Sequence, residues 1–216
     1  MKIRAVTPII TESFGPLILE EFARVARPGT EISNVFLDSG PASVESAYDE
    51  ALATPDVIAQ VRRAEREGID AVIINCMGDP GLEAAREVVS IPVIGPCEAS
   101  MHVAAMLGHK FSVLAVLDRI IPEFEDKARK YGLQDKLASV RSMDLPVLEL
   151  EKGREQFVAR AVDRAVEAIE EDGAHVIVLG CTGLAGLARR VEDCLLYTSD
   201  AADDLLCVDL GGRRII

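Results

Sequence analysis

The chain has 216 residues, 49% of them hydrophobic and 27% charged, so it can bury a sizeable core and is neither disordered nor fibrous. A formal net charge of −13 argues against a nucleic-acid partner, because binding to phosphates needs a basic surface. The apolar runs are too short for a membrane helix and the first residues lack a signal-peptide core, so we expect a cytoplasmic protein with no membrane partner.

Apolar, β-branched runs alternate with segments of helical period along the chain. The predicted strands cover residues 3–7, 31–37, 70–75, 92–94, 111–117, 138–143 and 175–179. The predicted helices cover residues 12–25, a stretch from Ser43, a helix with Pro55 in its first turn that runs to Glu67, and residues 80–89, 98–107, 121–131 and 156–171. This alternation predicts an α/β fold of parallel sheets flanked by helices.

The chain repeats itself when Cys76 is placed on Cys181. Residues 71–78 then superpose on residues 176–183, and the match extends into the helices on both sides. Each copy has a helix closed by Gly, a buried strand, Cys-x-Gly and a further helix. We therefore predict two pseudo-symmetric α/β lobes, each with a cysteine at the carboxyl end of a parallel strand, where ligands bind in open α/β sheets.

The repeat fails near its end. The strand predicted at residues 91–95 has no counterpart in residues 196–200. We divide the chain into a first lobe of residues 1–95, a second lobe of residues 96–194 and an anomalous tail of residues 195–216. The tail resembles translated sequencing-adapter read-through from a truncated metagenomic reading frame. The alternative is a divergent natural end in which residues 206–209 form a substitute strand.

Each cysteine of the pair is expected between a buried strand and a helix start. Backbone N–H groups at a helix start can receive an anion and lower the pKa of a thiol. This makes Met77 and Gly78, with Thr182 and Gly183, candidates to hold a carboxylate or an enolate. Two thiols facing each other across a cleft can invert a carbon acid, because one removes the Cα proton and the other returns a proton to the opposite face. This chemistry requires no metal and no other cofactor. The alternative, two buried structural thiols, explains a single such cysteine better than a matched pair.

Several segments resemble the aspartate/glutamate/hydantoin racemase superfamily, and most closely its hydantoin and allantoin racemase branch. They are residues 40–45, 76–82, 96–102, 144–147 and 180–184. The resemblance covers about residues 1–193 and implies a cofactor-independent, two-base mechanism at the lobe interface, with Cys76 and Cys181 as the acid/base pair. It also implies that the C-terminal segment returns to pack on the first lobe.

The resemblance also selects candidate binding residues. The first strand end, Val-Thr-Pro-Ile-Ile-Thr at residues 6–11, departs from the Asn-Pro-Asn-Thr pattern typical of hydantoin racemases. Arg119 lies in a loop that lines the pocket in relatives and could pair with a substrate carboxylate; an exposed arginine at a helix start is the alternative. The candidate substrate-binding residues are Thr7, Pro8, Asn75, Met77, Gly78, Arg119, Gly180, Thr182 and Gly183.

The function predicted from these residues is an isomerase, a racemase or epimerase of a small-molecule amino-acid derivative such as a 5-substituted hydantoin. A ring-flanked Cα–H is acidic enough for a thiolate base. The alternatives are an aspartate- or glutamate-type racemase, an isomerase or decarboxylase of a small diacid, and a non-enzymatic, truncated pair of lobes that binds a small acid. We expect a homo-oligomer.

The remaining polar and thiol residues carry less information. Cys97 is interpreted as structural, and no role is assigned to Cys194 or Cys207. Asp79 and Glu98 lie near predicted element ends, where helix capping is favoured over ligand binding.

Overall fold

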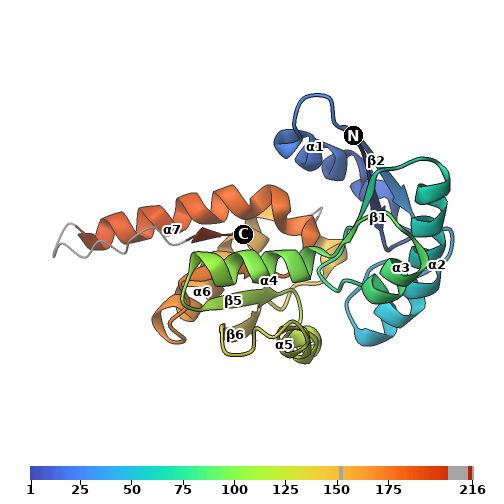
Figure 1. Ribbon diagram of the computed structural model, residues 1–216. Helices are drawn as coiled ribbons and strands as arrows, with labels where there is room; N and C mark the ends of the chain where they lie inside the picture. Colours follow the sequence, from blue (N-terminus) through green and yellow to red (C-terminus); the bar gives the residue numbers. More distant parts are fainter. Residues whose placement is uncertain (151–152, 204–213, 216) are drawn as a thin grey trace. The chain divides into compact units, whose positions relative to one another are not determined.

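The computed structural model describes residues 1–150, 153–203 and 214–215. The chain separates into two compact units, the first being Met1–Ala99 and the second beginning at Ser100. Figure 1 labels the helices and strands of both. None of the described helices combines the length and the apolar character that a membrane span requires.

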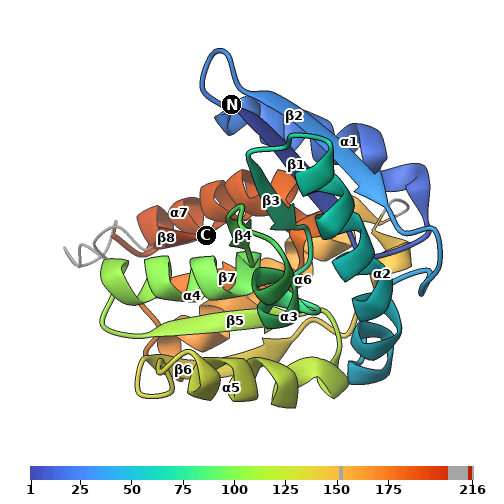
Figure 2. The same cartoon turned by 45° about the vertical axis from the view of Figure 1, so that its right-hand side comes forward.

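The first unit is built on a four-stranded parallel sheet with the order β2-β1-β3-β4. Its strands are β1 (Lys2–Thr7), β2 (Glu31–Phe36), β3 (Ala71–Ile74) and β4 (Val93–Ile94). Its helices are η1 (Glu12–Phe14, a 3-10 turn), α1 (Gly15–Val25), α2 (Ala47–Arg66) and α3 (Leu82–Val88). The core joins the apolar faces of β1, β3 and α2, with Val6, Val57 and Val72 fully buried. Figure 2 shows α2 and α3 beside this sheet.

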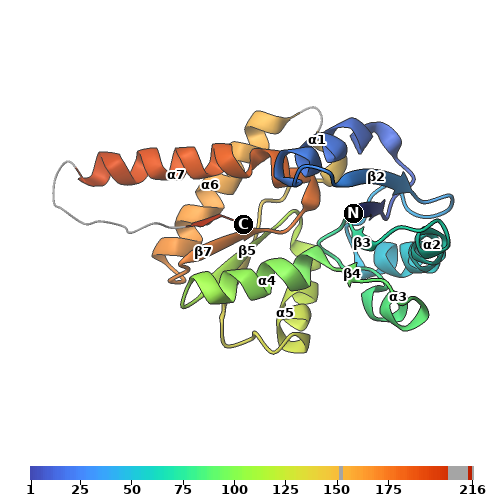
Figure 3. The same cartoon turned by 45° about the horizontal axis from the view of Figure 1, so that its top comes forward.

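The second unit has the same strand order, β6-β5-β7-β8, again parallel throughout. Its strands are β5 (Phe111–Ala115), β6 (Leu137–Ser142), β7 (Val176–Leu179) and β8 (Arg214–Ile215). The helical elements are α4 (Pro96–Leu107), η2 (Asp118–Ile120), α5 (Ile121–Lys130), η3 (Val147–Glu149), α6 (Arg154–Glu170), η4 (Thr182–Leu187) and α7 (Ala188–Asp203). Figure 3 shows β5 and β7 next to each other, flanked by α4 and α6. Along the chain, α4 begins in the first unit and ends in the second.

The predicted α/β fold with two parallel sheets flanked by helices is confirmed. The two sheets also correspond in register, because Ile3 pairs with Ala71 as Phe111 pairs with Val176. Beside each pair, the residue before the inner strand donates its N–H at 2.9 Å: Asp70 donates to the carbonyl of Lys2 in β1, and His175 to that of Lys110, just before β5.

One predicted helix start is wrong. Pro55 lies inside α2, which begins two turns earlier, so the stretch from Ser43 and the helix at Pro55 are largely one element. The Ser46 side chain caps this helix by accepting the N–H of Asp49 at 3.2 Å. A proline within a helix removes one hydrogen bond, and the cap and the buried apolar face of α2 outweigh that loss.

The helix α7 continues through Leu195 to Asp203, and Arg214–Ile215 pair with β7 in the place that β4 has in the first sheet. The division of the chain at residues 95 and 194, the origin of the tail and its packing on the first lobe stay predictions. Residues 206–209, with Cys207, lie outside the described residues.

Candidate functional site

In the first unit, the candidate residues gather at the carboxyl edge of the sheet. Thr7 ends β1, and Asn75 follows the adjacent parallel strand β3. The Asn75 Nδ2 donates to Thr7 Oγ1 at 3.2 Å, and this hydroxyl donates to Asn34 Oδ1 at 2.7 Å. Thr7 and Asn75 are both buried, as is Pro8. This edge therefore presents an ordered polar chain next to Cys76.

A tight turn carries Cys76. Its thiol is half-buried, and the N–H of Gly78 donates to Cys76 Sγ at 3.3 Å. The N–H of Asp79 donates to the Cys76 carbonyl at 3.0 Å, which closes the turn, while Met77 is buried. The turn therefore places a backbone N–H donor at the Cys76 sulfur.

The turn is packed against α2. A Cβ on Gly78 would lie 2.1 Å from Glu50 Oε1, so a side chain here requires Glu50 to move. Gly81, which has φ +71°, faces Thr54 one turn further along the same helix. The helix predicted over residues 80–89 is α3, which begins at Leu82, so the N–H near the sulfur belongs to the turn and not to a helix start.

In the second unit, Cys181 occupies the corresponding place after β7. Gly180 donates its N–H to the Leu114 carbonyl at 2.8 Å, as Asn75 does to Val6 in the first unit. The N–H of Leu184 donates to the Cys181 carbonyl at 3.0 Å, matching the closure of the Cys76 turn. A Cβ on Gly180 would lie 2.7 Å from the Leu114 carbonyl oxygen, so this position needs glycine.

An apolar side chain, that of Leu150, packs against the Cys181 turn. Cys181 is the N-cap residue of η4, a 3-10 helix that begins at Thr182, and its thiol is half-buried. A Cβ on Gly183 would lie 2.9 Å from Leu150 Cδ2 and 3.5 Å from Cys181 Sγ. The buried Leu150 is thus a neighbour of the cysteine turn. The expected α-helix start is a short 3-10 helix instead.

Arg119 lies in η2, directly after β5, and is exposed. Because β5 and β7 are adjacent and parallel, Arg119 belongs to the same sheet edge as Cys181. The structure thus groups six candidates (Thr7, Pro8, Asn75, Cys76, Met77 and Gly78) at one edge and five (Arg119, Gly180, Cys181, Thr182 and Gly183) at another. Their roles in binding and catalysis stay predictions.

Three residues near the candidate sites were missed from the sequence. Glu50 on α2 packs against Gly78, Leu150 at the end of η3 packs against Gly183, and Asn34 on β2 accepts a hydrogen bond from Thr7. All three are far along the chain from the residue that they contact. No motif marks them.

The Asp79 carboxylate accepts N–H groups from the first turn of α4, which confirms the capping predicted for it. Glu98 forms an ion pair with Arg86 at 2.5 Å. Cys97 is fully buried. Cys194 is exposed. Where the chain is described, no group of three or more His, Cys, Asp or Glu side chains could hold a metal ion.

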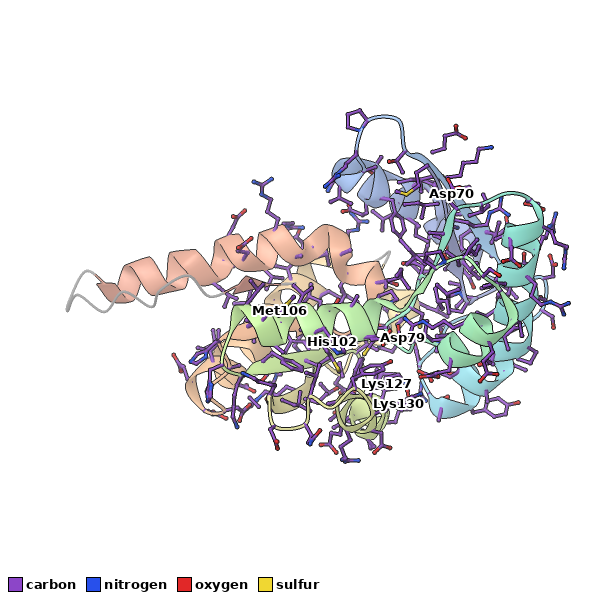
Figure 4. The ribbon with its side chains drawn as sticks, viewed as in Figure 1. Asp70, Asp79, His102, Met106, Lys127 and Lys130 are labelled. Atoms are coloured by element: carbon purple, nitrogen blue, oxygen red, sulfur yellow. The ribbon has the colours of Figure 1, made fainter. Side chains whose placement is uncertain are left out.

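The histidines lie away from both cysteine turns in the sequence and have their own partners. The rings of His102 and Tyr131 are 6.1 Å apart, and His175 Nδ1 accepts the N–H of His109 at 3.1 Å. Figure 4 shows His102 and Met106 on α4, with Lys127 and Lys130 on α5.

Comparison with known proteins places these features in a family context. Residues 3–205 match the sequence profile of a family described as Asp/Glu/Hydantoin racemase. A hydantoin racemase of Pseudomonas sp. (strain NS671) is 41% identical over 192 residues, which cover 89% of this chain and 77% of that protein. The allantoin racemase of Klebsiella pneumoniae has a TM-score of 0.86 at 34% identity, over 98% of this chain and 91% of that one. A glutamate racemase of Francisella tularensis subsp. tularensis SCHU S4 shares the fold, with a TM-score of 0.64 at 15% identity, over 99% of this chain and 86% of that one.

Proposed function

Because the chain belongs to the Asp/Glu/Hydantoin racemase family, we propose that it is an isomerase that racemises a 5-substituted hydantoin, with Cys76 and Cys181 as its two bases. The observation that carries the proposal is the matched backbone around the two thiols. Each follows the inner strand of a parallel sheet, and each carbonyl accepts the N–H three residues later at 3.0 Å. Two cysteines with a purely structural role would not require the same backbone hydrogen bonds around both thiols.

The substrate class follows from chemistry and from the relatives. One relative is named a hydantoin racemase and a structural neighbour an allantoin racemase. The carbon to be inverted in a hydantoin lies between a ring carbonyl and a ring nitrogen, so loss of its proton gives a stabilised enolate. A thiolate is a sufficient base for such a carbon, and the reaction needs no cofactor. The glutamate racemase, at 15% identity, favours neither an acidic amino acid nor a diacid as substrate.

In the proposed reaction, the thiolate of one cysteine removes the proton from C5, and the electron pair moves into the ring as an enolate. The thiol of the other cysteine then gives its proton to the opposite face of C5. The product is the mirror-image hydantoin, and the two sulfurs have exchanged protonation states. The enzyme is reset by proton exchange with water or by turning over the opposite enantiomer.

The remaining candidates have supporting roles in this proposal. The N–H of Gly78 stabilises the Cys76 thiolate, and Thr7 and Asn75 offer hydroxyl and amide groups that suit the polar edge of a hydantoin ring. We assign contact with the substrate also to Pro8, Met77, Arg119, Gly180, Thr182 and Gly183. A homo-oligomeric assembly and a cytoplasmic location stay predictions, and light scattering on the purified protein measures the first.

The test uses single enantiomers of a 5-substituted hydantoin and of allantoin in deuterated water, with an enzyme-free control for spontaneous exchange. We expect loss of optical rotation together with deuterium at the inverted carbon. Cys76→Ser and Cys181→Ser should each slow racemisation by about 10²-fold or more, the usual contribution of a general acid or base. Each variant should still exchange deuterium into one enantiomer without inverting it, because one base remains.

Cys194→Ser is the matched control, since this exposed thiol lies outside both cysteine turns. It should racemise at the wild-type rate. Racemisation that survives either serine substitution at Cys76 or Cys181 contradicts the two-base proposal, and release of CO₂ from a malonate-type diacid without racemisation would show a decarboxylase instead.

A further inference from the structure

Asp79, three residues after Cys76, has an unusual backbone. Its φ is +47°, and within the described residues Asp144, at +54°, is the only other non-glycine residue with a positive φ. This left-handed region is costly for residues with a side chain, though aspartate and asparagine tolerate it best. Asp79 is also buried, at 6% exposure, which is rare for an aspartate. A strained and buried carboxylate this close to a reactive thiol requires an explanation.

The backbone of Asp79 holds the cysteine turn closed. Its N–H donates to the Cys76 carbonyl at 3.0 Å, and its own carbonyl accepts the N–H of Leu82 at 3.2 Å, at the start of α3. The left-handed conformation lets one residue serve both bonds, since it reverses the chain between the turn and the helix.

The side chain of Asp79 is bonded to a different element. Its Oδ1 accepts the N–H of Cys97 at 3.0 Å, and its Oδ2 accepts the N–H of Glu98 at 2.9 Å. These are donors in the first turn of α4, and the carboxylate that caps them comes from 18 residues away in the sequence. Figure 4 labels Asp79 beside this end of α4. Two charge-assisted bonds at the positive end of a helix dipole make a strong and directional link.

Neighbouring residues reinforce this link. A Cβ on Gly95 would lie 2.6 Å from Asp79 Cγ and 2.6 Å from Leu82 Cδ2, so glycine is needed there for the carboxylate to reach α4. Arg86 joins the same parts from the other direction: its Nε donates to the Val93 carbonyl at 3.0 Å, and a terminal nitrogen pairs with Glu98 at 2.5 Å. The cysteine turn, α3, β4 and the start of α4 are thus held together around one carboxylate.

We propose that Asp79 is a positioning residue for Cys76, which fixes the orientation of the reactive turn by anchoring it to the first turn of α4. The inference rests on the proposed function in that Cys76 is one of the two bases. Without the anchor, the Cys76–Gly78 turn can reorient, and the N–H of Gly78 no longer points steadily at the sulfur. A displacement of about 1 Å at a reacting group can cost on the order of 10²-fold in rate.

The same link also involves Cys97, in the first turn of α4. A thiol in the first turn of a helix is normally favoured as a thiolate, because the N–H groups there stabilise negative charge. Here Asp79 already accepts the N–H groups of Cys97 and Glu98, and Cys97 is fully buried. The helix end is therefore used to hold the turn, and it is closed to a substrate anion.

The test compares Asp79→Asn and Asp79→Gly, with Asp144→Asn and Asp144→Gly as matched controls. Asparagine keeps the left-handed backbone and one acceptor but loses the charge, while glycine relieves the backbone and removes the carboxylate. The first readout is the rate at which iodoacetamide alkylates Cys76 relative to Cys181 in the folded protein, measured by peptide mass spectrometry. The second is kcat and KM for racemisation of one enantiomer of a 5-substituted hydantoin. Circular dichroism confirms that each variant is folded at the assay temperature.

We expect the Cys76-to-Cys181 alkylation ratio to fall in both Asp79 variants, and kcat to fall by about 10-fold to 10²-fold while KM changes little, because positioning acts on the reacting atoms. Asp79→Gly should be the slower of the two, although its backbone is the more relaxed. The Asp144 controls should leave the ratio and kcat unchanged.

An alkylation ratio that stays constant or rises overturns the inference, and so does an Asp79→Gly variant as active as Asp79→Asn. If either variant fails to fold, Gly95→Ala provides the second test, since it displaces the carboxylate without removing it and should lower the same ratio. A wild-type protein that racemises normally while Asp79→Asn keeps its ratio refutes the positioning role alone. A wild-type protein that does not racemise, with a ratio that falls in Asp79→Asn, refutes the proposed function alone.

Discussion

The two cysteine turns have matching backbone hydrogen bonds, but different side chains pack against them. In the first unit Gly78 packs against the carboxylate of Glu50, and in the second Gly183 packs against the buried methyl groups of Leu150. The backbone bonds that hold the two cysteines in place have the same lengths. The two turns therefore share their backbone hydrogen bonds, while the side chain packed against each turn differs.

The ion-pair clusters at the other end of the strands, away from the cysteine turns, also correspond between the two units but use different side chains. In the first unit Arg4, on β1, donates to Ser33 of β2 at 3.2 Å and pairs with Glu67 at the end of α2. In the second unit Ser112 and Ser139 occupy the register positions of Arg4 and Ser33, and the cation is instead Arg141, on β6. Each cluster ties a helix end to the two strands.

The second cluster holds more charge. Arg141 pairs with Glu167, Glu171 and Asp172, each at 2.6 Å, and Ser139 also donates to Asp172 at 2.6 Å. Asp172 falls on Glu67 at the offset that places Cys181 on Cys76. The cation has moved by one strand while its carboxylate partner has stayed, which shows that the helix-to-sheet link, rather than one arginine position, is what the fold requires.

The largest difference between the turns should appear when each glycine gains a methyl group. Gly78→Ala brings a Cβ to 2.1 Å from Glu50 Oε1, whereas Gly183→Ala brings one to 2.9 Å from Leu150 Cδ2. We expect Gly78→Ala to cost about 1–3 kcal/mol of unfolding free energy, as overpacking does, and to lower kcat because the N–H of Gly78 moves. Gly183→Ala should cost less. Urea unfolding and racemisation kinetics measure both.

Glu50→Ala in the Gly78→Ala background makes this comparison specific, because it removes the atoms that collide. Recovery of stability in the double variant is the expected result. The comparison would be contradicted by equal losses of unfolding free energy in the two alanine variants. It would also be contradicted by a double variant no more stable than Gly78→Ala, because either result would show that packing against Glu50 or Leu150 does not distinguish the turns.

A smaller difference is expected in the acid range. Hydrogen bonding to Arg141, opposed in part by burial and assisted by Ser139, holds the pKa of Asp172 below its ordinary 3.8. A carboxyl with a lowered folded pKa contributes stability that is complete above the ordinary pKa and is lost as the pH falls through the folded value. The unfolding free energy of the wild type should therefore fall more steeply below pH 3.8 than that of Asp172→Asn. Hydrogen bonds from Arg4 and Arg63 lower the pKa of Glu67 in the same direction. Parallel curves for the wild type and Asp172→Asn would contradict the assignment.

The smallest effect concerns the helix that precedes each cysteine strand. Ser46 caps α2 with its side chain, whereas the N-cap residue of α6 is Gly153, which has no side chain to cap with. Ser46→Ala should cost about 1 kcal/mol, and Gly153→Ser, whose Cβ has no neighbour closer than 3.6 Å, should gain a few tenths of a kcal/mol. Thermal unfolding of the two variants measures this, and a Gly153→Ser variant less stable than the wild type would show that the two helix starts are not equivalent.

Sequence reasoning succeeded where the determinants are local or repeated. Cys76 and Cys181 could be matched because a glycine, a buried strand and a Cys-x-Gly segment recur at one offset, and the recurrence implied two like sheets. It failed at Pro55, because a proline is a strong local signal for a helix start. The free energy lost by placing Pro55 inside α2 is small compared with that gained by burying the apolar face of the whole helix. It also expected the N–H groups near the cysteines to come from helix starts, since a turn of a few residues has no periodicity of its own.

The candidate site could be predicted only in part. Residues at the ends of β1 and β3 follow from the parallel sheet, and so Thr7, Asn75 and Cys76 could be grouped. Glu50 and Leu150 reach the cysteine turns from distant elements, and only the folded packing reveals them. Asp79 could be predicted in part. The residue type indicated a helix cap, but the helix that it caps, α4, is determined by the tertiary structure.

The first sheet finishes on a strand of only two residues, Val93–Ile94. A sheet border displays unpaired N–H and C=O groups, which a second molecule can use as a template for aggregation. A border this short offers very few such groups for an added chain to pair with. In the first unit, the brevity of the last strand thus protects the parallel sheet against growth by a foreign strand at that side.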